Sequence, residues 1–343
     1  MIQLSELDFF FGKKEKFVKE ESDKYHYFGV MVQNKKIIRY AIQILIVLFG
    51  VSFLTFCLIY IAPGDPAQVM LTECGLIPTP ELLAHTRAEL GIDKPFYIQY
   101  WKWLFGVLQG NFGKSYSLRI PVIQKIGQAF IPTCCLSFLS LFLMCVISIP
   151  AGILAAVKEN KWQDYLIRMI TFMGMSIPSF WLGLIFLSIF GVQLGLVSVS
   201  GGQADFRSVI LPAFTLAIAM SAKYIRQIRH VFLEELGKSY VTGARMRGIR
   251  ERDILWKHVL PNAMLPIITL LGISLGSLLG GTAIVEFVYN WPGMGRMAVK
   301  AIAAQDYPLI QAYVLIIAFL YLIINIAVDI SYKYLDPRVG EVD

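Results

Sequence analysis

Residues 131–157 read IPTCCLSFLSLFLMCVISIPAGILAAV and contain no Asp, Glu, Lys, Arg or His. A bilayer hydrocarbon core about 30 Å thick needs roughly 20 consecutive apolar residues for one helical crossing. This stretch meets that length, so it predicts a transmembrane helix. Its apolar character agrees with the whole chain, which is 56% hydrophobic and 16% charged, with a mean hydropathy of +0.61. A soluble protein could not keep so much apolar surface away from water.

Five other runs also lack those charged residue types: Ala41–Ala62, Met169–Leu194, Val209–Ala222, Ala263–Val285 and Ile310–Val328. Val209–Ala222 is short for a crossing and needs Phe206 or Tyr224–Ile228 to reach spanning length; a buried half-helix is the alternative. An odd number of crossings would place the loops on either side of this run on the same face. The sequence therefore predicts an all-α integral membrane protein with about six transmembrane helices. Gly174 and Pro178 are expected to kink the third helix.

The positive charge of the chain lies beside the apolar runs. Its formal net charge is +7, but the excess falls in short flanking segments, which is typical of topology signals and argues against nucleic-acid binding. Residues 223–257 carry nine Lys and Arg against four acids. Together with the basic residues in 35–39, 158–168 and 333–338, they predict that both termini are cytoplasmic. Residues 1–35 form a polar extension, and Met31 is an alternative start.

Residues 63–130, predicted to lie outside, are too long for a plain connector. Pro63-Gly64-Asp65-Pro66 predicts a turn, and Thr79-Pro80-Glu81 predicts a helix start that Gly91 ends. The aromatic stretch Phe96–Phe105 suits an amphipathic helix at the membrane interface. A second outer segment, 286–309, contains the rigid turn Trp291-Pro292-Gly293-Met294-Gly295.

The predicted cytoplasmic stretch 239–266 reads SYVTGARMRGIRERDILWKHVLPNAMLP. It predicts a helix, a glycine turn at Gly248, and a short amphipathic helix that ends before Pro261. Such a segment can present an apolar and basic knob to a soluble partner. From the residues alone, a basic loop lying on anionic lipid is equally compatible.

The segment 239–261 resembles the coupling loop of ABC importer permeases, whose pattern is E-A-A, three residues, Gly, nine residues, Ile-x-Leu-Pro. Ala244, Gly248, Leu260 and Pro261 match this spacing. Thr242, Gly243 and His258 depart from the Glu, Ala and Ile of the pattern. These departures resemble the peptide/nickel branch, with its Y-V-x-x-A-R-x-x-G and His-Val-Leu-x-Asn-Ala forms. The residues that the resemblance assigns to contact with an ATPase subunit are Tyr240, Ala244, Arg245, Gly248, Ile254, His258, Leu260 and Pro261.

The resemblance extends over residues 36–340 and includes the turn at 63–66, residues 111–115, 291–296, 306–308 and 335–338. It implies a type I importer permease in the bacterial inner membrane. The implied partners are a second permease, two ATP-binding subunits, a solute-binding protein and membrane lipid. ATP would be bound by the partners, so no cofactor or catalytic residue is expected here. The chain also contains no G-x-x-x-x-G-K-[ST], H-E-x-x-H or G-x-S-x-G motif.

The solute is open between two classes. Residues 78–91 most resemble nickel permeases, which favours nickel or another divalent metal carried as a chelate. Dipeptide and oligopeptide permeases share the later motifs, so a peptide is the alternative. The apolar runs offer no cluster of imidazole or thiolate ligands, the donors that nickel prefers, and the five cysteines form no C-x-x-C pair. No metal site is therefore predicted within the chain itself.

Candidate pathway residues are the small or polar side chains in or next to the predicted spans: Ser176, Ser274, Ser277, Glu286 and Asn290. Helix packing is the alternative role for the serines, and interfacial solvation for Glu286 and Asn290. An ion-coupled secondary transporter is the alternative from a different class. It usually carries ionisable groups near the membrane midplane, often in repeated halves, and the predicted spans show neither.

Overall fold

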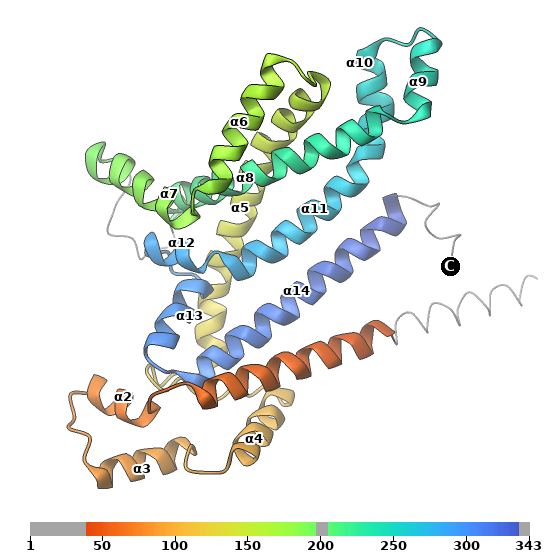
Figure 1. The fold of residues 1–343 in the computed structure, drawn as a ribbon. Helices are drawn as coiled ribbons and strands as arrows, with labels where there is room; N and C mark the ends of the chain where they lie inside the picture. The colour runs from red at the N-terminus through yellow and green to blue at the C-terminus, as the bar shows by residue number, and fades with distance from the viewer. Residues whose placement is uncertain (1–38, 197–204, 336–343) are drawn as a thin grey trace, which may run out of the picture. The chain divides into compact units, whose positions relative to one another are not determined.

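The computed structural model describes residues 39–196 and 205–335. The chain divides into two compact units, Met1–Val51 and Ser52–Asp343. Residues 39–51 of the first unit are helical, and this helix continues to Ile61. The other helices belong to the second unit (Figure 1): α2 Pro66–Glu73, α3 Pro80–Leu90, α4 Phe96–Leu108, α5 Val122–Val157, α6 Trp162–Ser176, α7 Ser179–Phe186, η1 Leu187–Gln193, α8 Phe206–Leu236, α9 Ser239–Met246, α10 Glu251–Asp253, η2 Ile254–Val259, α11 Leu260–Gly281, α12 Ala283–Val288, α13 Met294–Ala303 and α14 Tyr307–Leu335. The predicted extension 1–35 lies outside the described residues.

The helical fold predicted from the sequence is confirmed. By length and composition, five helices of the described residues can cross a membrane, or six if α6 and the α7–η1 segment form one broken span. The short run at Val209–Ala222 is part of α8, which extends it in both directions and removes the doubt about its length. The helix over the fifth predicted run ends earlier than expected: α11 ends at Gly281, and α12 starts at Ala283.

The third predicted span is sharply broken. Helix α6 ends at Ser176, α7 begins at Ser179, and the two axes differ by 96°. Ile177 and Pro178 form the break, because proline removes an N–H donor and forces its predecessor out of the helical region. The predicted kink is thus confirmed as a near right-angle bend.

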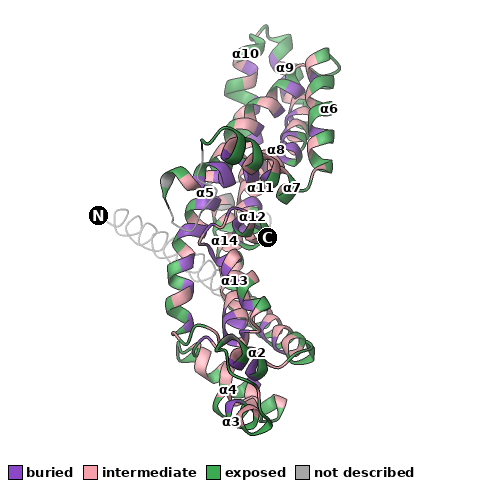
Figure 2. Cartoon of the chain, turned by 90° about the vertical axis from the view of Figure 1, so that its left-hand side faces the viewer, coloured by how far each residue is buried: buried purple, intermediate pink, exposed green. Residues whose placement is uncertain are grey.

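Helices α5 and α8 pack along each other at the centre of the second unit. Gly152 permits their close approach, since a Cβ atom there would lie 2.7 Å from Ile228 Cγ2. Tyr289 ties α7 and α8 to the residues after α12: its hydroxyl lies 2.8 Å from Thr215 Oγ1 and donates to the Gly183 carbonyl at 3.0 Å. Many residues of α6 are exposed, whereas α8 and α13 contain many buried residues (Figure 2).

The two segments predicted to lie outside the membrane meet at Asp306. Its buried carboxyl group accepts hydrogen bonds from Ser115 Oγ, from the backbone N–H of Tyr116 at 3.1 Å and from Ser117 Oγ at 2.9 Å. Gln305 Nε2 donates a hydrogen bond to the Pro63 carbonyl oxygen at 3.0 Å. Segments 63–130 and 286–309 therefore share one end of this unit, which the sequence predicted.

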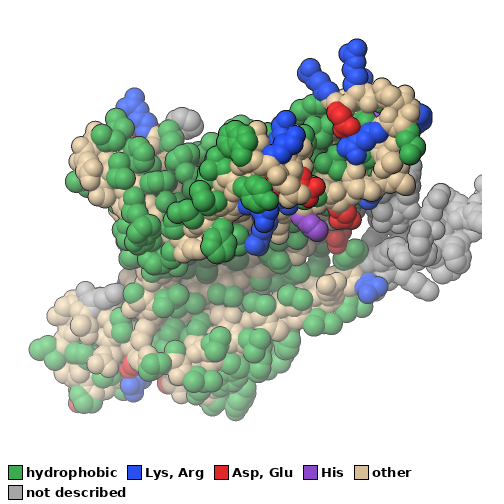
Figure 3. Space-filling model, turned by 45° about the horizontal axis from the view of Figure 1, so that its top comes forward, with side chains coloured by type: hydrophobic (Ala, Val, Ile, Leu, Met, Phe, Trp, Pro, Cys, Tyr) green, Lys and Arg blue, Asp and Glu red, His purple; other side chains and the backbone are tan. Residues whose placement is uncertain are grey.

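At the other end of the unit, α9 and α10 project beyond α8 and α11 (Figure 1). Near this end, Asp164 at the start of α6 pairs with Arg229 of α8. Apolar side chains cover most of the molecular face in Figure 3, and Lys and Arg gather at the end that carries α9 and α10.

Candidate functional site

The segment 239–261 forms two short helical pieces joined by a turn at Gly248. Helix α9 ends in a double hydrogen bond, with Gly248 N donating to Arg245 O at 2.9 Å and Ile249 N to Ala244 O at 3.2 Å. Gly248 has a φ of +73°, in the left-handed region that favours glycine. A Cβ atom at this position would meet no neighbouring atom within 4 Å, so the requirement for glycine comes from the backbone conformation alone. The predicted glycine turn is confirmed.

One face of this segment is attached to the helix bundle. Val241, Ala244, Ile254 and Val259 are buried and pack in one cluster with Phe232 of α8. Ala244 and Ile254, two of the residues predicted to contact an ATPase subunit, therefore face the chain's own core. They position the segment, and its outer surface is made by other residues.

Polar contacts hold the two pieces at a set angle. Arg245 spans the glycine turn and pairs with Glu251, with a 2.7 Å distance from Nε to Oε1, and this hydrogen bond raises the pKa of Arg245. Glu235, at the end of α8, accepts from Tyr240 Oη at 2.8 Å and from Lys238 Nζ. Burial, followed by the bond to Glu235, raises the pKa of Tyr240. Glu235 was missed from the sequence because its position before the turn gave no motif.

The opposite face of the segment is exposed and carries two large apolar side chains. Met246 is 84% exposed and Trp256 is 53% exposed. Other exposed residues of the segment include Arg245, Gly248, Lys257, His258 and Pro261, whereas Tyr240 and Leu260 are half-buried. Large apolar side chains exposed among charged residues in a segment of this kind are suited to contact a soluble protein.

The short amphipathic helix does not end before Pro261, and this part of the prediction was wrong. Residues 251–281 form one continuous helical run, in which Pro261 lies in the first turn of α11. The six residues Ile254–Val259 form a π-helical segment immediately before it. A π-helical turn shifts the hydrogen-bond register by one residue, which accommodates a proline without breaking the run. The exposed face around Trp256 is thus part of the same helical run as a membrane-spanning helix.

The predicted pathway serines lie on two different elements. Ser176 is exposed at the end of α6, directly before the 96° break, and its hydroxyl donates to Phe172 O at 3.2 Å. Ser274 and Ser277 lie one turn apart on α11, the first buried and the second exposed. Both hydroxyls bond to carbonyl groups of their own helix. Their contribution to a pathway stays a prediction.

Glu286 is completely buried. It is therefore not placed to meet an entering ligand, which was the predicted role, nor to be solvated at the interface, which was the alternative. Its Oε1 accepts from Thr133 Oγ1 at 2.8 Å and from Thr282 Oγ1 at 2.9 Å, and its Oε2 accepts from the backbone N–H of Arg296 at 3.0 Å. The carboxyl group therefore caps the first turn of α13, where free N–H groups favour an acidic partner. Asn290 is half-buried in the turn that follows α12, with a φ of +53°.

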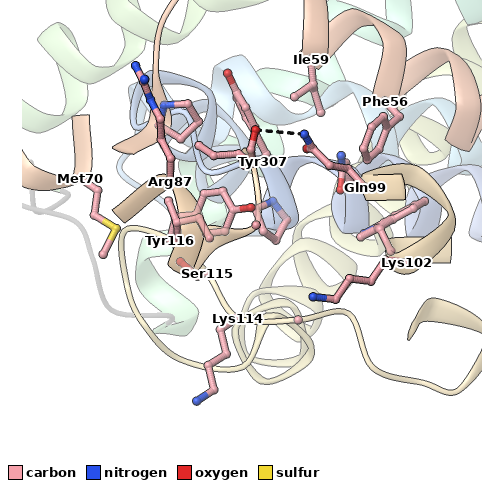
Figure 4. A pocket seen from close by; sticks show the side chains of 18 of the residues that line it. Phe56, Ile59, Met70, Arg87, Gln99, Lys102, Lys114, Ser115, Tyr116 and Tyr307 are labelled. Carbon is pink, nitrogen blue, oxygen red and sulfur yellow. Dashed lines mark hydrogen bonds between the residues drawn. The ribbon is translucent and has the colours of Figure 1, made fainter. Parts of the chain in front are cut away.

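A cavity of about 910 Å³ lies at the end of the second unit that carries segment 63–130. Its wall combines aromatic rings from Phe56, Tyr60, Trp103, Tyr116 and Tyr307 with charged side chains. In Figure 4, Tyr116 and Lys102 reach toward its middle from different elements, whereas Lys114 points away at the rim. Burial, followed by the nearby Asp306 and Tyr307, raises the pKa of Tyr116 to about 12, so its hydroxyl remains a hydrogen-bond donor at physiological pH. The sequence did not predict this cavity, which depends on contacts between segments far apart in the chain.

Among the described residues, no group of three or more His, Cys, Asp or Glu side chains is arranged to hold a metal ion. His85 lies on the surface of α3, 3.9 Å from Glu89, and His230 and His258 are on separate elements.

Residues 148–341 match the family model described as "Binding-protein-dependent transport system inner membrane component", and residues 33–140 match the model of its N-terminal region. The chain belongs to this family of transporter permeases. It is 37% identical over 292 residues to the glutathione transport system permease protein GsiC of Escherichia coli strain K12, covering 85% of this chain and 94% of the relative. GsiC of Salmonella paratyphi A is 37% identical over 289 residues, covering 84% and 93%.

The fold resembles that of solved transporter structures. The MetNI methionine ABC transporter in an inward-facing conformation aligns with a TM-score of 0.52 and 18% identity, over 62% of this permease and 97% of the solved chain. A second crystal form of that transporter gives a TM-score of 0.50. At this level of identity the likeness concerns the fold alone. It agrees with the type I importer permease fold that the resemblance implied.

Proposed function

We propose that this permease forms half of the membrane channel of an ATP-driven importer and that its solutes are small peptides of the glutathione type. The observation that carries the transport role is the exposed face of segment 239–261, which is continuous with the spanning helix α11. A partner that moves Trp256 would move the inner end of α11 with it, since no loop separates them. ATP hydrolysis takes place in the partner subunits, so the permease supplies mechanical coupling and the pathway.

The peptide class replaces nickel as the favoured solute. The GsiC relatives are named for glutathione and match most of this permease, which supports the peptide alternative. The nickel hypothesis rested on the resemblance of residues 78–91. These residues comprise helix α3 and the few residues beside it. The described residues also provide no cluster of metal ligands. A chelated metal would have to be recognised through its organic chelator.

The proposed assembly contains a second permease, two ATP-binding subunits and a solute-binding protein. Both termini and segment 239–261 are assigned to the cytoplasm of a bacterial inner membrane, on the basis of the positive charge in 223–257. Segments 63–130 and 286–309 then face the solute-binding protein. The structure of the second unit is compatible with this arrangement, because these segments and segment 239–261 occupy its opposite ends.

The test is uptake by the complete transporter in proteoliposomes, with labelled glutathione and labelled nickel offered separately, the latter with and without a chelator. We expect uptake of glutathione that requires both ATP and the ATP-binding subunits. Preferred uptake of nickel would contradict the solute class. Uptake driven by an ion gradient in the absence of nucleotide would contradict the importer mechanism and favour a secondary transporter.

A further inference from the structure

The cavity beside segment 63–130 has an excess of positive charge. Its charged lining residues are Arg87, Lys102, Arg119 and, at the rim, Lys114, against Asp65 and Glu89. Asp65 is already paired, with its Oδ2 2.7 Å from Arg87 Nη2. Among the described residues, no ion pair involves Lys102, Lys114 or Arg119. The wall therefore attracts anions.

The neutral part of the wall also contains hydrogen-bond donors, of which the Tyr116 hydroxyl belongs to a lining residue. Trp103 lines the cavity, and its buried Nε1 has no acceptor among the residues that the structure describes. Tyr116, from the loop between α4 and α5, adds a hydroxyl whose pKa is raised to about 12, so it is protonated at neutral pH. The loop that carries Tyr116 is held in place by Asp306.

The size of the cavity, about 910 Å³, lies within the range of small-molecule sites, which is roughly 300–1,000 Å³. Its aromatic rings fit apolar side chains, and its cations and the Tyr116 hydroxyl fit carboxylates. We propose that this cavity is a solute-binding vestibule that holds carboxylate-bearing small peptides before they enter the membrane pathway. The inference rests on the proposed function and deepens it, because it names the anionic groups by which the solute is recognised.

The experiment measures binding by the full-length permease in nanodiscs of zwitterionic lipid, without nucleotide. The probes are glutathione and its diethyl ester, in which both carboxylates are blocked. Lys102→Gln and Arg119→Gln are compared with Lys94→Gln, which removes an exposed cation of the same segment that does not line the cavity. We expect each cavity variant to weaken glutathione binding by about three- to tenfold, since each removes a charge-assisted contact at a solvent-accessible site. The control variant should bind as the wild type does.

Equal affinity for glutathione and its diethyl ester would overturn the proposal, as would an equal effect of all three substitutions. A second arm adds phosphatidylglycerol to the nanodiscs. If this lipid competes with glutathione for the wild-type protein but not for Lys102→Gln, the cavity is supported as a site for carboxylates and other anions. If the protein binds the lipid but not glutathione, the peptide assignment is rejected. If a cavity variant loses glutathione binding but the complete transporter containing it shows unchanged ATP-driven uptake, the vestibule role is contradicted and the importer function stands.

Discussion

Asp164 and Arg229 form a two-pronged ion pair, with distances of 2.7 Å both from Arg229 Nε to Asp164 Oδ1 and from Nη2 to Oδ2. Asp164 is fully buried, and it also accepts from the backbone N–H of Asn160 at 3.1 Å. The pair joins the start of α6 to α8 near the end that carries segment 239–261. It therefore fixes the loop between α5 and α6 against the helix that leads into that segment.

Replacing Arg229 with Gln should destabilise the permease, because Asp164 would keep a buried charge without its partner. The expected loss is about 3 kcal/mol. Thermal unfolding in detergent measures it. Arg226→Gln, which removes an exposed cation one turn earlier on α8, should leave the unfolding temperature nearly unchanged. The double variant Asp164→Asn, Arg229→Gln should recover part of the loss; an Arg229→Gln protein as stable as the wild type would show that the pair has no structural role.

Replacing Gly248 with Val should uncouple ATP hydrolysis from uptake while leaving membrane insertion intact. The left-handed backbone at this turn costs a non-glycine residue about 1–2 kcal/mol, so the turn would relax and reorient α9 relative to α10. The measurement is the ratio of solute taken up to ATP hydrolysed in proteoliposomes. Gly243→Ala, a substitution within α9 that meets no neighbouring atom, is the matched control. Normal coupling in Gly248→Val would reject the docking role.

Met246→Ala and Trp256→Ala should weaken association with the ATP-binding subunits without lowering the stability of the permease. Both side chains are exposed, and large apolar side chains of this kind dominate binding energies at interfaces. Copurification of the subunits and thermal unfolding are measured in parallel. Ile254→Ala provides the opposite pattern, because truncating this buried residue should cost about 2–5 kcal/mol of stability. Full copurification of the Trp256→Ala complex would place the contact elsewhere.

Asp306→Ala should release the loop between α4 and α5 from the start of α14. The buried carboxyl group holds Ser115, Tyr116 and Ser117, and its removal leaves their donors unpaired, at a cost on the order of 3 kcal/mol. Limited trypsin digestion should then cleave faster at the exposed Arg119. Asp93→Asn, an exposed acid between α3 and α4, serves as the control. Unchanged cleavage would show that other contacts suffice to hold the loop.

Alkaline pH should loosen the same region. The pKa of Tyr116 is about 12 in the folded protein against an ordinary value of 10.0. Because the folded value is raised, the stabilising contribution of the protonated hydroxyl is complete below pH 10 and is lost as the pH rises toward about 12. The stability of the wild type should therefore fall over this window. Tyr116→Phe should remove that part of the pH dependence, and an identical profile for both proteins would contradict the assignment.

The sequence predicted those features that neighbouring residues determine. Thr79, Pro80 and Gly91 delimit α3 as expected, since caps act within a few residues. Gly248 forms its turn for the same reason. The apolar runs predicted the spans because bilayer thickness sets their length.

Features that depend on distant partners were not predictable in this way. The role of Glu286 depends on Thr133, which is 153 positions away in the sequence, and no pattern around Glu286 indicates that contact. The same applies to Asp306 and Ser115, which are 191 positions apart. The exposed face of segment 239–261 was predicted only in part, because burial of Ala244 and Ile254 depends on Phe232 in a preceding helix.

The π-helical segment Ile254–Val259 has a consequence for the angular position of Trp256. Each residue of an α-helix advances about 100° around the helix axis. Removing a single residue between Trp256 and Val259 would therefore rotate Trp256 and the residues before it by roughly that angle relative to α11. The indole would then face a different direction, although every side chain of the spanning helix stayed where it was.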